Sequence, residues 1–97
     1  MINYSIIIPH KNIPLLLQRC LDSIPIRDDL EVIVVDDDSD PSLVDFDSFP
    51  GKDRKDVEIV LDKMGKGAGA SRNIGLSRAK GKWVVFCDAD DFFNYCF

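Results

Sequence analysis

An apolar run that ends in carboxylates lies near the end of this 97-residue chain: Val84-Val85-Phe86-Cys87-Asp88-Ala89-Asp90-Asp91. Residues 83–87 predict a β-strand that is buried on both faces, as in a parallel sheet. Carboxylates at the carboxyl end of such a strand face the crevice in which open α/β sheets bind ligands. Two aspartates one residue apart can offer hard oxygen ligands to a divalent cation, and that cation can hold a diphosphate.

A second acidic cluster, Asp36-Asp37-Asp38, follows another apolar run at residues 32–35. Taken alone, either cluster could be a solvated turn or a helix cap. Taken together, the two clusters predict one acidic crevice, because parallel strands end at the same edge of a sheet. Such a crevice is electrostatically unfavourable unless a cation or a hydrogen-bonding ligand occupies it.

The periodicity of the chain predicts an α/β protein. Four β-rich runs predict strands at residues 4–8, 31–35, 57–61 and 83–87. A flexible glycine segment precedes a second helix at about residues 70–79, which Gly81 is expected to end. The polar segment 39–55 is predicted to be a connection with a short helical turn around residues 43–46.

The first helix is predicted from a continuous apolar stripe with helical spacing. Asn12 is the expected N-cap, Pro14 fits the first turn, and Pro25 closes the helix. The stripe consists of Ile13, Leu16, Leu17, Cys20, Leu21 and Ile24.

The composition is that of a globular protein, with 45% hydrophobic residues and a length that suits one small domain. The net charge of −5 argues against nucleic acid as a partner. Cys20, Cys87 and Cys96 have no metal-site spacing and predict reduced thiols in a cytoplasmic protein. The sequence has neither a signal peptide nor a run of membrane-spanning length, although a position at a membrane surface remains compatible with it.

Two other interpretations compete for the same residues. Gly65, Gly67 and Ala70, with Asp88 about 20 residues later, match a dinucleotide fingerprint of NAD-binding oxidoreductases. The match is weak, because residues 62–64 separate the strand from the first glycine. The second alternative is a non-catalytic metal- or phosphate-binding signalling module, such as a phospho-receiver. A receiver should have its acid pair after the first strand, whereas the first predicted strand of this chain ends in Pro9-His10.

Two further side chains near the predicted crevice have an ordinary structural explanation. Arg72, at the start of the second helix, could be a surface cation, but contact with a base or phosphate is also plausible there. His10 follows Pro9 at the end of the first strand. A lone histidine is more often a packing or hydrogen-bonding residue than a catalyst, so we assign His10 no proton-transfer role.

These residues converge on one pattern. Residues 5–12 (SIIIPHKN) resemble the opening S-I-I-I-P-x-x-N of family 2 glycosyltransferases, which have the GT-A fold. Residues 34–39 (VVDDDS) look like the V-V-D-D-G-S block of that family, with Asp38 at the place of a small residue.

The second half of the chain continues the resemblance. Residues 67–75 (GAGASRNIG) are similar to G-x-x-x-A-R-N-x-G, with Ser71 in place of alanine. Residues 86–91 (FCDADD) resemble F-L-D-x-D-D, which contains the Asp-x-Asp metal motif. Four blocks in this order and spacing are specific, and they span residues 5–93.

The resemblance implies a role for each matching residue. The carbonyl region of Pro9 would border the nucleotide, and Asp37 would hydrogen-bond its base. Arg72 would help to hold the base or the diphosphate, and Asp88 would contact the ribose side. Asp90 would ligate Mg²⁺ or Mn²⁺, and this ion would bridge the diphosphate and stabilise the leaving group as negative charge develops on it.

The resemblance also implies a truncated Rossmann-like GT-A fold, a parallel sheet of about four strands with flanking helices. Residues 1–97 would form the donor-binding part, which takes a nucleotide-sugar, while the acceptor-binding part is absent. The catalytic base is expected beyond Phe97, so this chain alone would be inactive. The whole protein would transfer sugar from a UDP-sugar to a glycan or lipid-linked acceptor in cell-surface polysaccharide synthesis. It would be cytoplasmic, at or near the inner face of the membrane.

Overall fold

The computed structural model describes residues 1–90 of the chain. The predictions that concern Asp91, Cys96 and the apolar residues 92–97 therefore lie outside the described residues. The elements, in chain order, are β1 (Tyr4–His10), α1 (Pro14–Asp22), β2 (Leu30–Asp37), the 3₁₀-helix η1 (Phe46–Ser48), β3 (Val57–Asp62), α2 (Ala68–Arg78) and β4 (Trp83–Phe86).

The strands form one four-stranded sheet in the order β3-β2-β1-β4, and every pairing in it is parallel. The predicted α/β class and the four parallel strands are confirmed. The chain proceeds from β1 to β2 and β3 in one direction, and then crosses over to place β4 on the other side of β1. This reversal creates a switch point at the carboxyl ends of the central strands, where open α/β sheets bind ligands.

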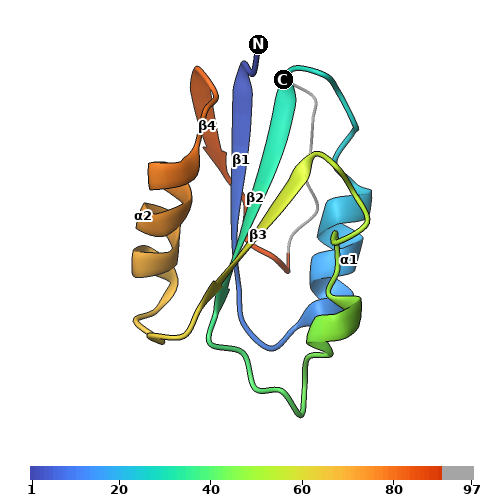
Figure 1. Cartoon of the computed structure of the whole chain (residues 1–97), viewed down its shortest axis with the longest axis vertical. Helices are drawn as coiled ribbons and strands as arrows, with labels where there is room; N and C mark the ends of the chain where they lie inside the picture. The colour runs from blue at the N-terminus through green and yellow to red at the C-terminus, as the bar shows by residue number, and fades with distance from the viewer. Residues whose placement is uncertain (91–97) are drawn as a thin grey trace.

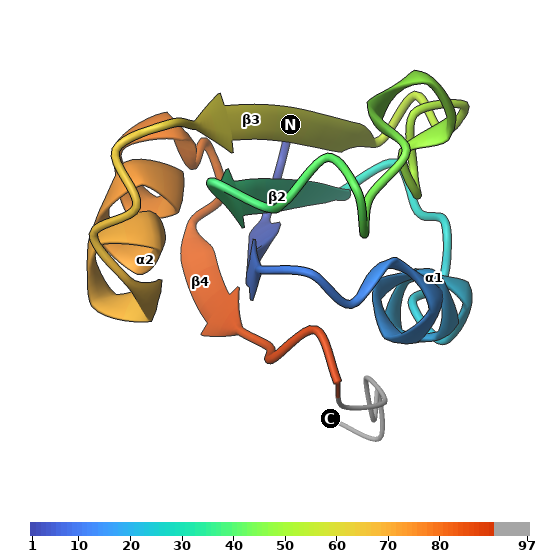
Figure 2. The ribbon, with the colours of Figure 1, turned by 90° about the horizontal axis from the view of Figure 1, so that it is seen from below.

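The two α-helices lie on opposite faces of the sheet (Figures 1 and 2). Side chains alternate between these faces along a strand. In β1, Ile6 and Ile8 belong to the core that includes Leu17 and Leu21 of α1. Ile7, between them, contacts α2 instead. The three consecutive isoleucines are therefore all buried, because helices cover both faces of the strand.

The prediction that β4 is buried on both faces is wrong for the described part of the chain. Trp83 is 62% exposed and Phe86 is 50% exposed, while Val84 and Val85 are half-buried. The physical reason is the position of β4 at the edge of the sheet, where β1 is its partner and no strand within residues 1–90 covers its other side.

Helix α1 differs from its prediction at both ends. Ile13, not Asn12, occupies the N-cap position, and no side chain caps the helix there. The helix ends at Asp22, before Pro25, and its last turn is closed by the backbone N–H of Ser23. Leu16 lies toward the edge of the apolar stripe and is 36% exposed.

The later elements are also shifted. Helix α2 begins at Ala68 and ends at Arg78, so Gly81 does not end it. A Cβ at Gly81 would lie 2.6 Å from the backbone nitrogen of Ser5, which explains a glycine there by close approach of two segments. The helical turn expected around residues 43–46 is found two to three residues later, as η1.

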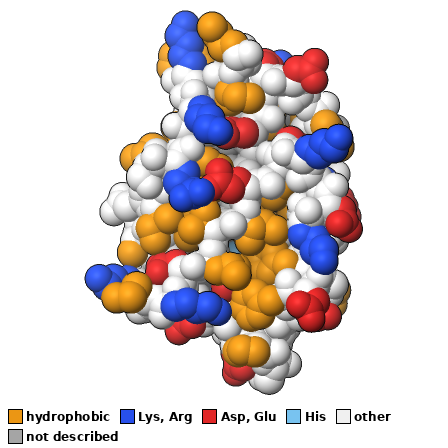
Figure 3. Space-filling model, in the orientation of Figure 1, with side chains coloured by type: hydrophobic (Ala, Val, Ile, Leu, Met, Phe, Trp, Pro, Cys, Tyr) orange, Lys and Arg blue, Asp and Glu red, His pale blue; other side chains and the backbone are white. Residues whose placement is uncertain are grey.

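The surface carries charges of both signs. Figure 3 shows Lys and Arg interspersed with Asp and Glu, with hydrophobic side chains gathered in the lower half of this face. Leu61 and Met64 are among the exposed large hydrophobic residues. Cys20 is buried and Cys87 is half-buried, and their Sγ atoms lie 3.5 Å apart. Neither helix in residues 1–90 has the length and apolar content needed to cross a bilayer.

Candidate functional site

The carboxyl ends of β1 and β2 bring together segments that lie 26 residues apart in the sequence. The parallel register pairs Pro9 with Val35 and His10 with Asp36. This edge of the sheet is the lower end of the molecule in Figure 1 and faces the viewer in Figure 2. One residue of the acidic triplet is therefore next to the lone histidine, and the triplet begins inside the strand rather than after it.

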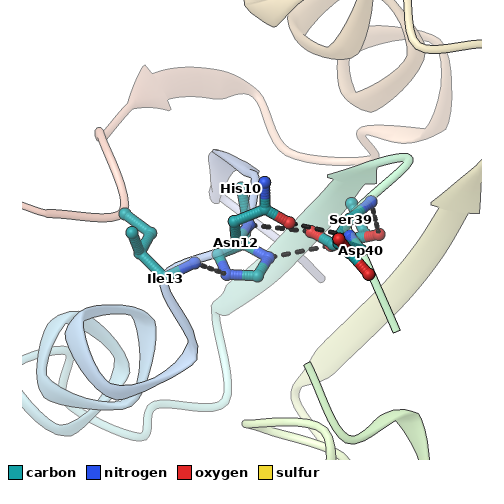
Figure 4. A network of polar contacts seen from close by, with 6 residues as sticks. His10, Asn12, Ile13, Ser39 and Asp40 are labelled. Carbon is teal, nitrogen blue, oxygen red and sulfur yellow. Dashed lines mark hydrogen bonds and ion pairs between the residues drawn. The ribbon is translucent and has the colours of Figure 1, made fainter. Parts of the chain in front are cut away.

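A closed network of hydrogen bonds joins these two strand ends (Figure 4). His10 Nδ1 lies 2.9 Å from Asp36 Oδ1, and both side chains are buried. The hydroxyl of Ser39 donates to Asp36 Oδ1 at 2.6 Å, and the N–H of Ser39 donates to Asp36 Oδ2 at 3.1 Å. The carboxylate of Asp36 thus has three hydrogen-bond partners from the protein itself.

Asn12 ties the first turn to the second from the other side. Its N–H donates to Ser39 Oγ at 2.9 Å, and its Oδ1 accepts from the N–H of Asp40 at 2.7 Å. Asn12 has a φ of 62°, a left-handed conformation that asparagine tolerates better than most residues. The prediction that Asn12 caps α1 is corrected: its amide serves the turn that follows β2.

The hydrogen bonds around Asp36 determine its charge. Burial alone raises the pKa of Asp36, but the hydrogen bonds from His10 and Ser39 outweigh burial, so the pKa lies below the usual value of 3.8. Asp36 is therefore an ionised structural carboxylate, and three of its roughly four acceptor sites are already in use. It has little capacity left to bind a ligand.

Asp37, the next residue, is in the opposite situation. Its side chain is 6% exposed, and its Oδ1 is buried with no hydrogen-bond partner among residues 1–90. A buried acceptor without a partner costs free energy of roughly 1–3 kcal/mol, so its persistence in a structure requires an explanation. A ligand that donates a hydrogen bond to Asp37 supplies one.

A hollow of about 90 Å³ lies beside Asp37. Its lining consists of Pro9, His10, Lys11, Asp37 and Ala68. The structure thus brings together Pro9 and Asp37, the two residues expected to border and bind a base. Ala68 adds the start of α2 to the wall, which the sequence did not identify.

Asp38 stands where the resembling blocks have a small residue, and its backbone explains that preference. Its φ of 51° is in the left-handed region, which glycine adopts freely and aspartate tolerates. Gly65, with a φ of 63°, lies next to it: a Cβ at Gly65 would be 3.5 Å from Asp38 Oδ2. The carboxylate of Asp38 therefore lies against the loop between β3 and α2.

The predicted residues Arg72 and Asp88 are also neighbours. One guanidinium nitrogen of Arg72 lies 3.3 Å from Asp88 Oδ1, and the side chains are 39% and 60% exposed. An exposed pair of this kind contributes little to stability. It does hold a cation of α2 beside a carboxylate that follows β4, and both groups remain accessible to a ligand.

Asp90 is exposed, and α1 holds its backbone. Arg19 donates to the carbonyl oxygen of Asp90 at 2.9 Å, a contact that no local signal in the sequence could indicate. Within residues 1–90, no three His, Cys, Asp or Glu side chains are close enough together to hold a metal ion by themselves. Asp88 and Asp90 both follow β4 and are exposed, so their carboxylates could contribute ligands to a metal that also binds the donor.

Ser71, like Asp37, has a buried side-chain oxygen that lacks a hydrogen-bond partner within residues 1–90. Ser71 is fully buried in the first turn of α2. An alanine at this position, as in the resembling block, would leave no such group. The structure does not place Ser71 in the lining of the hollow.

Comparison with known proteins identifies relatives that match most of the chain. The sequence model described as Glycosyl transferase family 2 matches residues 5–95. The poly(ribitol-phosphate) beta-glucosyltransferase of Bacillus spizizenii is 36% identical over 94 residues, which cover 91% of this chain and 15% of that protein. The GalNAc(5)-diNAcBac-PP-undecaprenol beta-1,3-glucosyltransferase of Campylobacter jejuni is 36% identical over 90 residues, or 90% of this chain and 29% of that protein.

A solved structure gives the same result in three dimensions. The crystal structure of S. aureus TarS 1-349 in complex with UDP-GlcNAc matches with a TM-score of 0.79 and 28% identity, over 96% of this chain and 28% of that chain. The expected GT-A architecture is confirmed by this likeness. The chain spans less than a third of the length of each of these proteins.

Proposed function

This chain belongs to glycosyl transferase family 2, and we propose that it carries the donor-binding part of an enzyme that transfers sugar from a UDP-sugar to an acceptor hydroxyl. Residues 1–97 would bind the nucleotide-sugar. The NAD-binding and signalling interpretations lose their basis, because the family match includes the glycine segment and both acidic clusters.

The observation that carries this proposal is the unpartnered Oδ1 of Asp37 beside the hollow. A pyrimidine such as uracil has a ring N–H that donates a hydrogen bond, and a carboxylate oxygen is a strong acceptor for it. Pro9 at the end of β1 would border the base. The neighbouring Asp36 could not replace Asp37, because its oxygens already accept three hydrogen bonds.

Arg72, Asp88 and Asp90 would serve the rest of the donor. Arg72 would contact the base or the diphosphate, and Asp88 would face the ribose. Magnesium is usually bound in proteins by one or two carboxylates together with substrate phosphates. A site with Asp90, assisted by Asp88, fits that pattern better than a complete protein cage would. Bound there, Mg²⁺ or Mn²⁺ would offset the negative charge that develops on the leaving diphosphate.

The names of the relatives support the class of acceptor that we propose. Two of them are named for a polymer or lipid-linked acceptor, poly(ribitol-phosphate) and a PP-undecaprenol glycan. We extend this class of acceptor to the present chain and place the protein in the cytoplasm, at the inner face of the membrane, in cell-surface polysaccharide synthesis. Because no acceptor site or base is assigned within residues 1–97, this polypeptide alone should transfer no sugar, which a UDP-release assay with candidate acceptors would test.

The experiment for donor binding is a calorimetric titration of the 97-residue polypeptide with UDP. We expect binding with Mn²⁺ or Mg²⁺ and a marked loss of affinity in excess chelator, because the acidic crevice repels a bare diphosphate. NAD serves as the comparison ligand for the dinucleotide alternative. Equal UDP affinity with and without the metal would contradict the metal bridge, and tighter binding of NAD than of UDP would contradict the proposed function.

A further inference from the structure

His10 is the one histidine of the chain, and its ring is buried at the junction of three elements. It ends β1, pairs with Asp36 of β2 and lies just before α1. The ring of Phe49 packs against it edge to face, with 5.5 Å between the ring centroids. A buried imidazole has two nitrogens that need partners, and both partners are present here (Figure 4).

The partners of the ring determine its tautomer. The backbone N–H of Ile13 lies 3.1 Å from His10 Nε2, and because an amide N–H can only donate, Nε2 must accept and carries no hydrogen. The hydrogen of the neutral ring is therefore on Nδ1, which donates to the ionised carboxylate of Asp36 at 2.9 Å. Neither the opposite tautomer nor the doubly protonated ring satisfies Ile13.

The ring thereby connects the two segments that form the hollow. Through Nε2 it holds the turn that leads from β1 into α1, which carries Lys11. Through Nδ1 it holds the carboxylate of Asp36, on the face of the sheet that α1 covers. Successive side chains in a strand point to opposite faces, so fixing Asp36 on one face directs Asp37 to the other, where Ala68 of α2 lines the hollow.

We infer that His10 is a positioning residue of the nucleotide site: its neutral, Nδ1-protonated ring orients Asp37 and Lys11 without contacting the reacting atoms of the donor. This inference rests on the proposed function for its consequence, but the state of the ring can be measured independently. It also gives the lone histidine a role in donor affinity rather than in proton transfer.

The first test is nuclear magnetic resonance of the uniformly ¹⁵N-labelled chain. Long-range ¹H–¹⁵N correlations of the ring are unambiguous, because the sequence contains a single histidine. We expect a protonated Nδ1 and an unprotonated Nε2 at neutral pH. A ring with its hydrogen on Nε2, or with both nitrogens protonated, would overturn the inference whether or not the chain binds UDP.

The second test compares UDP affinity, with Mn²⁺ present, in wild type and in two variants of His10. His10→Leu removes both hydrogen bonds of the ring, while His10→Asn can place an amide nitrogen near the position of Nδ1 and keep the bond to Asp36. We expect UDP affinity to fall about tenfold or more in His10→Leu and to be partly restored in His10→Asn. If His10→Leu fails to fold, the comparison of His10→Asn with wild type still tests the positioning role. The expected loss of UDP affinity is then smaller.

The control for general loss of stability is Leu30→Val. Leu30 is buried at the amino end of β2, six residues and about 20 Å along the strand from Asp36. We expect this variant to melt at a lower temperature and to bind UDP as wild type does. Wild-type affinity in both His10 variants would overturn the positioning role, as would an equal loss in Leu30→Val. Absence of UDP binding by wild type would instead contradict the proposed function.

Discussion

The side chain of Ile7 in β1 fills the space that a Cβ on Gly75 of α2 would need. Helix and strand therefore approach each other as closely as a glycine allows. Arg72 lies three residues before Gly75, about one turn along the same helix, so this contact also determines how far Arg72 stands from Asp88 and the sheet. The last glycine of the G-x-x-x-A-R-N-x-G block thus has a packing reason.

Replacing Gly75 with alanine should destabilise the chain by about 1–3 kcal/mol, because the added methyl group overlaps Ile7 in a packed interface. Gly69→Ala is the matched control in the same helix, since a Cβ at Gly69 meets no atom within 4 Å. We expect Gly69→Ala to raise stability by about 0.5–1 kcal/mol through helix propensity. Urea unfolding measures both, and a stabilising Gly75→Ala would show that α2 does not pack this closely.

The free energy of unfolding should fall in acid, in part through Asp36. Because its pKa in the folded state lies below its value in the unfolded chain, the unfolded state binds the proton more readily. The contribution of Asp36 is therefore constant above about pH 5, begins to fall near pH 4 and is lost as the pH drops through the folded-state pKa.

The measurement is urea unfolding at a series of pH values for wild type and Asp36→Asn. The variant should be less stable at neutral pH and should show a shallower loss between about pH 4 and pH 2. Asp45→Asn removes an exposed carboxylate whose pKa is also lowered, by hydrogen bonds from Ser48 and Asp47. Asp45→Asn should change the free energy of unfolding by less than Asp36→Asn does, because solvent screens the exposed carboxylate of Asp45. If the free energy of unfolding depends on pH in the same way in wild type and in Asp36→Asn, the lowered pKa of Asp36 is contradicted.

Ser71→Ala should stabilise the chain by about 1 kcal/mol, since it removes a buried hydroxyl that has no partner within residues 1–90. Ser77 offers a comparison in the same helix, because it is exposed and donates to the carbonyl of Ile74. Ser77→Ala should change stability by less than about 0.5 kcal/mol. A clear destabilisation by Ser71→Ala in thermal melts would mean that the hydroxyl has a partner in solution.

Asp90→Asn should weaken metal-dependent UDP binding by roughly tenfold or more while leaving the melting temperature nearly unchanged, because the side chain is exposed. Asp53→Asn, an exposed carboxylate in the loop before β3, is the control for loss of one negative charge. Titrations with Mn²⁺ and UDP compare the two. Normal nucleotide binding by Asp90→Asn would exclude Asp90 as a metal ligand.

Much of the fold could be predicted because its signals are local. The apolar runs and the helical stripe depend on neighbouring residues, and they located all four strands and both helices. The exposure of β4 could not be predicted, because an apolar run has the same composition at the edge of a sheet as at its centre. Asn12 was misassigned for a related reason: a preference for helix caps is local, whereas its bond to Asp40 spans 28 residues.

The structure shows which residues of the candidate site lie close together, while their roles in binding stay predictions. The blocks identified Pro9, Asp37, Arg72 and Asp88, and the structure brings them together as two pairs. That Asp36 is satisfied and Asp37 is not follows from the register of β1 against β2, which places His10 beside Asp36. Three consecutive aspartates in a sequence do not reveal which carboxylate lacks a hydrogen-bond partner in the folded chain.

The most direct test of the central claim is the effect of Asp37→Ala on UDP binding and on stability, measured on the same samples. The variant should bind UDP at least about tenfold more weakly in the presence of Mn²⁺, because it lacks the acceptor for the base. Its free energy of unfolding should be unchanged or higher, because the buried Oδ1 has no partner in residues 1–90. Asp53→Ala should leave UDP affinity unchanged. Wild-type UDP affinity in Asp37→Ala would contradict the account.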